Sequence, residues 1–156
     1  MIEAPLPADE AARLNALERY QLVGIGRERP FDHVTELAAE MFGVPYSLVS
    51  IVGSDTQCFR GSWGLEEPGT SRRVAFCAHA ILKPDVMVVE DAAEDGRFHD
   101  NPLLTEQPFI RFYAGAPIVL DGTALGTICL LYRQPPQFRA TEQKRLEKLA
   151  RSVGDI

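Results

Sequence analysis

The dipeptide Asp121-Gly122 lies between two long runs of apolar and β-branched residues, and it constrains the fold more than any other feature of this chain. Asp-Gly favours a two-residue turn with positive φ at both central positions, and such a turn matches the twist of antiparallel strands. The runs over residues 109–120 and 123–132 therefore predict two long strands joined as a hairpin.

Three further segments predict strands. Residues 44–52 (VPYSLVSIV) are β-branched and apolar on both faces, which is typical of a central strand. The turn at 53–55 returns the chain into a second strand at 57–61, and the two form an antiparallel hairpin. Residues 85–90 (DVMVVE) predict another strand.

Apolar residues at helical spacing predict three longer helices. The first runs from an Asp9 cap to about Tyr20, the second spans 31–42 and ends at Gly43, and the third starts at a Thr141 cap. Residues 74–82 predict a short helix or turn. The remaining segments, at 24–30, 62–71 and 91–105, predict loops.

Mostly antiparallel strands between terminal helices define the α+β class. We expect a central sheet of about five to six strands, with the N- and C-terminal helices packed on one face. Loops and the short helix cover the other face. A chain of 156 residues has the length of one domain.

Composition excludes several classes of partner and setting. The net charge of −6 and the pI of about 5.1 argue against a nucleic-acid surface. The chain has no run of about 18 apolar residues and no basic and apolar leader, so we expect neither a membrane partner nor a secretory signal. Three cysteines are an odd number and predict no disulfide scaffold, which indicates the cytoplasm.

The segment Cys77-Ala78-His79 carries the most reactive side chains of the chain. A thiol and an imidazole near a pocket suit a nucleophile, a redox switch, a metal or a covalent chromophore. Residues two apart point to different sides of a helix, and the spacing matches no zinc motif. A packed Cys77 and a hydrogen-bonded His79 are therefore the competing interpretation.

Arg111 and Tyr113 alternate along one predicted strand and therefore share a face of the sheet. If that face lines a cavity, the guanidinium suits a carboxylate or phosphate ligand. The alternative is an ion pair between Arg111 and an acidic neighbour, Asp91 or Asp95.

Three aromatic residues, Phe59, Trp63 and Phe98, have the size and positions to wall a pocket. The alternative for each of them is ordinary packing in the core or over it. Both interpretations stay open at this point.

We predict no metal site and no catalytic residue. Asp91, Asp95 and Asp100 share a loop, but the Glu that ends a calcium loop is absent, so turn and cap roles are favoured. His33 and His99 have the chemistry of axial haem ligands, and solvated or capping roles are the alternative.

Four stretches carry a family resemblance: FDHVTELA leading into FGVP (31–38, 42–45), RVAFCAHAI (73–81), VED with DGRF and NP (89–91, 95–98, 101–102), and IRFYAGAP with LGTICL (110–117, 125–130). In this order and spacing they resemble the GAF domain, a small-molecule sensory module of bacterial histidine kinases and diguanylate cyclases. The resemblance covers about residues 18–153. It leaves the cofactor, if any, unspecified.

The resemblance implies an N-terminal signalling helix (1–20), a GAF core (21–139) and a C-terminal helix (140–156). It implies an unknown small-molecule ligand, a homodimer through the terminal helices, and a signal passed to an output domain such as a kinase or cyclase. The candidate pocket residues are Phe59, Trp63, Cys77, His79, Asp91, Phe98, Arg111 and Tyr113.

Two other functions are alternatives. One is a thiol enzyme that resembles free methionine-R-sulfoxide reductase and uses Cys77, which requires a second thiol within disulfide reach. The other is a dimerisation module whose side chains fill its own cavity. Bilin-binding relatives attach their chromophore through a Cys followed directly by His, and here Ala78 intervenes.

Overall fold

The computed structural model describes residues 1–23, 26–134, 136 and 138–155. Six strands form one sheet in the order β3-β2-β1-β6-β5-β4, and every neighbouring pair is antiparallel. The strands are β1 (Tyr46–Val52), β2 (Thr56–Trp63), β3 (Gly69–Ser71), β4 (Met87–Val89), β5 (Phe112–Leu120) and β6 (Thr123–Tyr132).

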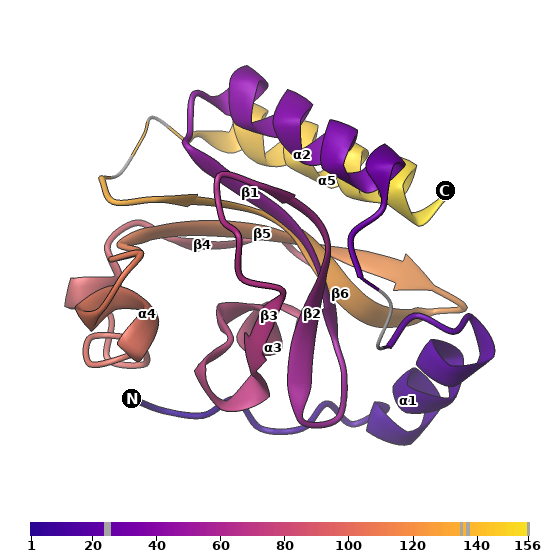
Figure 1. Cartoon of the computed structure of the whole chain (residues 1–156). Helices are drawn as coiled ribbons and strands as arrows, with labels where there is room; N and C mark the ends of the chain where they lie inside the picture. The colour runs from indigo at the N-terminus through magenta and orange to yellow at the C-terminus, as the bar shows by residue number, and fades with distance from the viewer. Residues whose placement is uncertain (24–25, 135, 137, 156) are drawn as a thin grey trace.

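Two layers of other elements cover the sheet. The helices are α1 (Glu10–Arg19), α2 (Arg29–Phe42), α3 (Phe76–Ala80), α4 (Pro102–Thr105) and α5 (Ala140–Gly154), with short 3-10 turns at Arg72–Val74 and Ala92–Glu94. Figure 1 shows α2 and α5 side by side on one face, and α3, α4 and their loops on the other. The predicted α+β class and sheet are confirmed. In the part of the chain that the structure describes, no helix is long and apolar enough to cross a membrane.

The hairpin predicted from Asp121-Gly122 joins β5 to β6. Asp121 has a φ of 53° and Gly122 a φ of 75°, as a turn of this type requires. Strand β6 has the predicted bounds, whereas β5 begins at Phe112 rather than at residue 109. Phe109 has a φ of 58°, which lies outside the extended region, so the strand starts only after it.

Alternation along the strands separates two hydrophobic clusters. On β6, Ile128 and Leu130 pack in the cluster beneath α2 and α5, whereas Cys129 and Leu131 pack in the cluster beneath α3. Successive strand residues point to opposite faces, so one strand contributes directly to both layers.

Helix α1 does not lie beside α5, although both terminal helices were expected on one face. It packs through Ala16 and Leu17 against Ile51, near the C-terminal end of β1, and Leu125, near the N-terminal end of β6. In Figure 1 it lies at the lower right, away from the layer of α2 and α5. The second helix, α2, takes the expected place next to α5, because its longer apolar face covers the sheet.

Of the three predicted helix caps, two lie at the predicted positions and one does not. Gly43 ends α2 in the left-handed region, with a φ of 66°, as expected. Asp9 is the N-cap residue of α1, as predicted, but its carboxylate accepts a hydrogen bond from Thr123 Oγ1 at 2.7 Å and none from the backbone of the helix. Thr141 lies inside α5, whose N-cap is Arg139, and the Glu142 carboxylate accepts from the Arg139 backbone N–H.

The segment predicted as a loop at 62–71 contains the short strand β3. Gly69 permits the approach of β3 to β2, since a Cβ there would lie 2.1 Å from the carbonyl oxygen of Gln57. The predicted loop positions 24–25 and the last residue of the predicted C-terminal helix, 156, lie outside the described residues.

Candidate functional site

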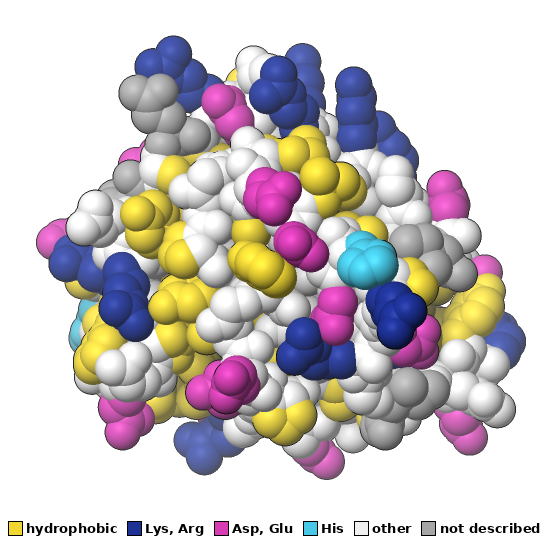
Figure 2. All heavy atoms as spheres, turned by 45° about the horizontal axis from the view of Figure 1, so that its top comes forward, with side chains coloured by type: hydrophobic (Ala, Val, Ile, Leu, Met, Phe, Trp, Pro, Cys, Tyr) yellow, Lys and Arg dark blue, Asp and Glu magenta, His cyan; other side chains and the backbone are white. Residues whose placement is uncertain are grey.

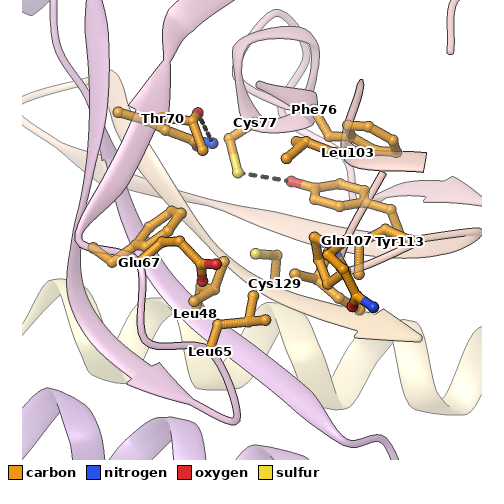
Figure 3. A pocket seen from close by; sticks show the side chains of 15 residues that line it. Leu48, Leu65, Glu67, Thr70, Phe76, Cys77, Leu103, Gln107, Tyr113 and Cys129 are labelled. Atoms are coloured by element: carbon orange, nitrogen blue, oxygen red, sulfur yellow. Dashed lines mark hydrogen bonds between the residues drawn. The ribbon is translucent and has the colours of Figure 1, made fainter. Parts of the chain in front are cut away.

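A cavity of about 100 Å³ lies on the face of the sheet that α3 covers. Strands β1, β2, β5 and β6 form its floor, and α3, α4 and the segments that follow β2 and α4 enclose it (Figure 3). Most of its wall is apolar, from Leu48, Phe59, Leu65, Phe76, Leu103, Pro108, Ile110 and Leu131.

A buried polar cluster lies at one end of the cavity. The Tyr113 hydroxyl donates a hydrogen bond to Cys77 Sγ at 3.2 Å, and Thr127 Oγ1 lies 3.1 Å from the same sulfur. The Cys129 thiol contributes most to lowering the pKa of the Cys77 thiol to about 7; burial opposes the charged form, and the hydrogen bonds with Thr127 and Tyr113 favour it. Burial is also the main reason why the pKa of Tyr113 lies well above its ordinary value.

A second polar chain crosses the cavity wall on β1, β2 and β3. Ser50 Oγ donates to the Gln57 side-chain oxygen at 2.7 Å, and the Gln57 amide donates to Thr70 Oγ1 at 2.7 Å. The Thr70 hydroxyl in turn donates to the backbone oxygen of Ser71 at 2.9 Å. These hydrogen bonds satisfy the polar groups of the wall within the protein.

Charged groups are confined to the mouth of the cavity. Glu67 is the one charged side chain among the residues found to line it, and Glu67 and Gln107 are both exposed. Arg133 stands near the mouth, where its guanidinium donates to the backbone oxygen of Pro108 at 3.0 Å. Along the described wall, the interior therefore holds no Asp, Glu, Lys, Arg or His side chain, and its ionisable groups are the thiols of Cys77 and Cys129 and the Tyr113 hydroxyl.

Of the eight predicted pocket residues, the structure brings Phe59, Cys77 and Tyr113 together in the lining of this cavity. Phe98 lies one layer behind them, buried, with its ring stacked on that of Phe76 at 4.1 Å between centroids. Whether any of these residues contacts a ligand stays a prediction.

Trp63 does not reach the cavity and is 43% exposed. The reason is a β-bulge in β2. Phe59 pairs with Ser50 and Gly61 with Val49, so that no residue of β1 lies opposite Arg60. One extra residue reverses the alternation of faces, so Trp63 and Phe59 do not share a face.

Arg111, Asp91 and His79 also lie outside the cavity. Arg111 precedes β5 and makes two hydrogen bonds to the Asp91 carboxylate, at 3.0 and 2.6 Å, which is the alternative considered for this arginine. The His79 ring hydrogen-bonds through Nε2 to the backbone oxygen of Ile2 at 3.0 Å. Partners at the surface thus hold all three side chains away from the cavity.

Several lining residues were not predicted, notably Gln57, Thr70 and Cys129. A further one acts on the site without lining it: a Cβ at Gly115 would lie 2.1 Å from the Tyr113 hydroxyl oxygen. Gly115 therefore leaves the space in which the Tyr113 ring extends to Cys77. The sequence signal for this arrangement was the pattern Tyr-x-Gly, which places Tyr113 and Gly115 on the same face of a strand.

Within the described ranges, no group of three or more His, Cys, Asp or Glu side chains is arranged to hold a metal ion. His33 and His99 are exposed and do not line the cavity.

A six-stranded antiparallel sheet with two helices on one face and a cavity on the other defines a small α+β domain. The profile of the GAF domain family matches residues 26–155, and this chain belongs to that family.

Relatives and solved structures agree with this assignment. A cyclic di-GMP phosphodiesterase of Pseudomonas aeruginosa is 40% identical over 136 residues, a match that covers 86% of this chain and 23% of that protein. This chain therefore spans less than a quarter of that relative.

Two solved structures illustrate the shared fold. The GAF domain of a phosphoenolpyruvate-protein phosphotransferase from Acinetobacter has a TM-score of 0.69 and 14% identity, covering 96% of this chain and 93% of that chain. Free methionine-R-sulfoxide reductase from Neisseria meningitidis has a TM-score of 0.67 and 20% identity, covering 99% and 95%. At these identities the likeness concerns the fold alone.

Proposed function

We propose that this chain is the sensory module of a larger cytoplasmic signalling protein of bacteria. Its cavity binds a small molecule, and the layer of α2 and α5 carries the state of the cavity to an output domain. The observation that carries the proposal is a cavity that the side chains of the protein leave open, on the face of the sheet opposite this helix layer. The match to less than a quarter of a phosphodiesterase supports a role beside a separate enzymatic domain.

The strands between the two layers provide the route of the signal. Cys129 and Leu131 line the cavity, and their neighbours Ile128 and Leu130 pack in the same cluster as Leu146 of α5. Because protein interiors are close-packed, a ligand that displaces β6 must shift side chains on both faces. Two positions of β6 relative to α5 then differ in ligand affinity, which is what coupling requires.

We further propose that the homodimer forms through α2 and α5 rather than through α1 and α5, which lie apart. Leu37 and Met41 of α2 are each 51% exposed, and a second copy of the chain would cover them. Figure 2 turns this layer forward and shows hydrophobic side chains exposed between charged ones, with Lys and Arg gathered at the top of the view.

A thiol-dependent enzyme is the second candidate, since two thiols, Cys77 and Cys129, line one cavity. The charge of the site argues against it. A free amino acid, the substrate class of such an enzyme, carries a carboxylate, and the described interior offers no Lys, Arg or His side chain to pair with it. We therefore propose that the domain binds its ligand and does not transform it. The unfilled cavity likewise argues against a dimerisation module without a ligand.

A chimaera tests the sensory function. This chain replaces the matching region of the Pseudomonas phosphodiesterase, and the rate of cyclic di-GMP hydrolysis is measured. Leu65→Phe narrows the cavity and is expected to change that rate at least twofold, because the filled cavity mimics one signalling state. Leu6→Phe, at an exposed site, is the matched control. Equal rates in the parent chimaera and in Leu65→Phe contradict the proposal.

A further inference from the structure

We propose that the ligand of this cavity is an uncharged, largely apolar molecule of about five heavy atoms. The inference rests on the proposed sensory function and names the class of ligand that the site accepts. Three properties of the cavity carry it: the absence of acidic and basic side chains along the described interior, the internal pairing of its polar atoms, and its volume.

The first property is charge. Glu67 is exposed at the mouth, and the Arg133 guanidinium at the mouth donates to Pro108 and, at 3.4 Å, to Gln107 Oε1. Arg111, the cation that sequence patterns suggested for an anionic ligand, is paired with Asp91. A buried phosphate or carboxylate without a cation beside it is strongly disfavoured, and an ammonium finds no Asp or Glu side chain in the described interior.

The second property is hydrogen bonding. Gln57 accepts from Ser50 and donates to Thr70, and Tyr113 donates to Cys77. Across the described chain, the buried side-chain polar atoms without a partner all belong to Arg60, which does not line the cavity. A ligand therefore meets apolar wall and polar groups that are already paired, and this favours an apolar body.

The third property is size. An aliphatic cavity of ~150 Å³ admits benzene, and this cavity has a volume of about 100 Å³. A branched molecule such as isobutyl alcohol fits this space, whereas a nucleotide requires the enclosing segments to open. Figure 3 shows the close approach of side chains from opposite walls around this space.

Three probes that share one branched carbon skeleton test the proposal: isobutyl alcohol and isobutylammonium, with five heavy atoms each, and isobutyrate, with six. Each is titrated into the full chain while the methyl resonances of Leu48, Ile110 and Leu131 are followed by NMR. We expect the alcohol to shift these resonances with a Kd at least tenfold lower than that of either ion. An ion that binds as tightly as the alcohol overturns the inference and leaves the sensory function standing. If no probe shifts them, the inference about the ligand is overturned, and the chimaera alone decides on the sensory function.

Two variants locate the binding. Leu65→Phe is expected to abolish the alcohol-induced shifts. The control, Leu6→Phe at an exposed site, should leave the shifts unchanged. If the shifts persist in a folded Leu65→Phe variant, the alcohol binds elsewhere, and the inference is overturned. Glu67→Gln removes the charge at the mouth from an exposed site, and the preference for the alcohol is expected to persist. Its loss would assign selectivity to the mouth carboxylate and overturn the inference.

Discussion

Glu10→Gln is expected to lower the free energy of unfolding at pH 7 by about 2–3 kcal/mol. The Glu10 carboxylate bridges two guanidinium groups, with Arg13 at 2.5 Å and Arg72 at 2.8 Å. Arg13 is fully buried and donates to the backbone oxygen of Val52 at 2.5 Å, so this cluster fastens α1 to the end of β1. Without the carboxylate, a buried cation loses its counter-ion.

The pH dependence of this loss follows from the pKa of Glu10. Burial opposes ionisation, but hydrogen bonds from Arg72 and Arg13 outweigh it and lower the pKa from 4.5 to about 2. A group whose pKa is lowered in the folded state stabilises it above the unfolded pKa, and the effect is lost as the pH falls through the folded value. The difference between wild type and variant should therefore shrink between pH 4.5 and pH 2.

Urea unfolding across this pH range measures the effect. Glu18→Gln on the exposed side of the same helix is the matched control and should change stability by less than about 0.5 kcal/mol at pH 7. A Glu10→Gln difference that is equally small, or that does not depend on pH, contradicts the role given to this cluster.

Phe76→Ala is expected to cost about 3–5 kcal/mol of unfolding free energy and to enlarge the cavity. Phe76 lines the cavity, is 3% exposed, and packs its ring against Phe98 at 4.1 Å and Tyr113 at 5.3 Å between centroids. The enlarged space should admit benzene, which then restores part of the lost stability by binding only the folded state.

Phe112→Ala is the control for this effect. Phe112 is equally buried, but it packs in the cluster beneath α2 and α5 and is not among the residues that line the described cavity. Urea unfolding with and without benzene should show similar losses for the two variants and a larger recovery for Phe76→Ala. Equal recovery would mean that the cavity does not extend to Phe76.

The sequence predicted those parts of the fold that local chemistry determines. The bounds of β6 follow from the Asp121-Gly122 turn, and the end of α2 follows from Gly43. Strand β3 was missed because three polar residues show no periodicity. The position of α1 was missed because an apolar stripe indicates that one face of a helix is buried but does not indicate which part of the protein covers that face.

The candidate site was predictable only in part. Phe59, Cys77 and Tyr113 stood out by chemical type and face the cavity. Trp63 was misplaced because a bulge at Arg60 reverses the strand faces, and no sequence pattern indicates that bulge. Gln57 was overlooked because a polar residue on a strand suggests a solvated face, whereas Ser50 and Thr70 pair with it inside the protein.

Hydrogen–deuterium exchange tests the central claim most directly, namely that occupancy of the cavity is transmitted across the sheet to the helix layer. The chain is compared with and without isobutyl alcohol, at a concentration that saturates the shifts of the cavity methyls. We predict altered exchange in α5, residues Ala140–Gly154, in addition to changes around α3. Changes confined to the segments that enclose the cavity, with α2 and α5 unaffected, would contradict the account.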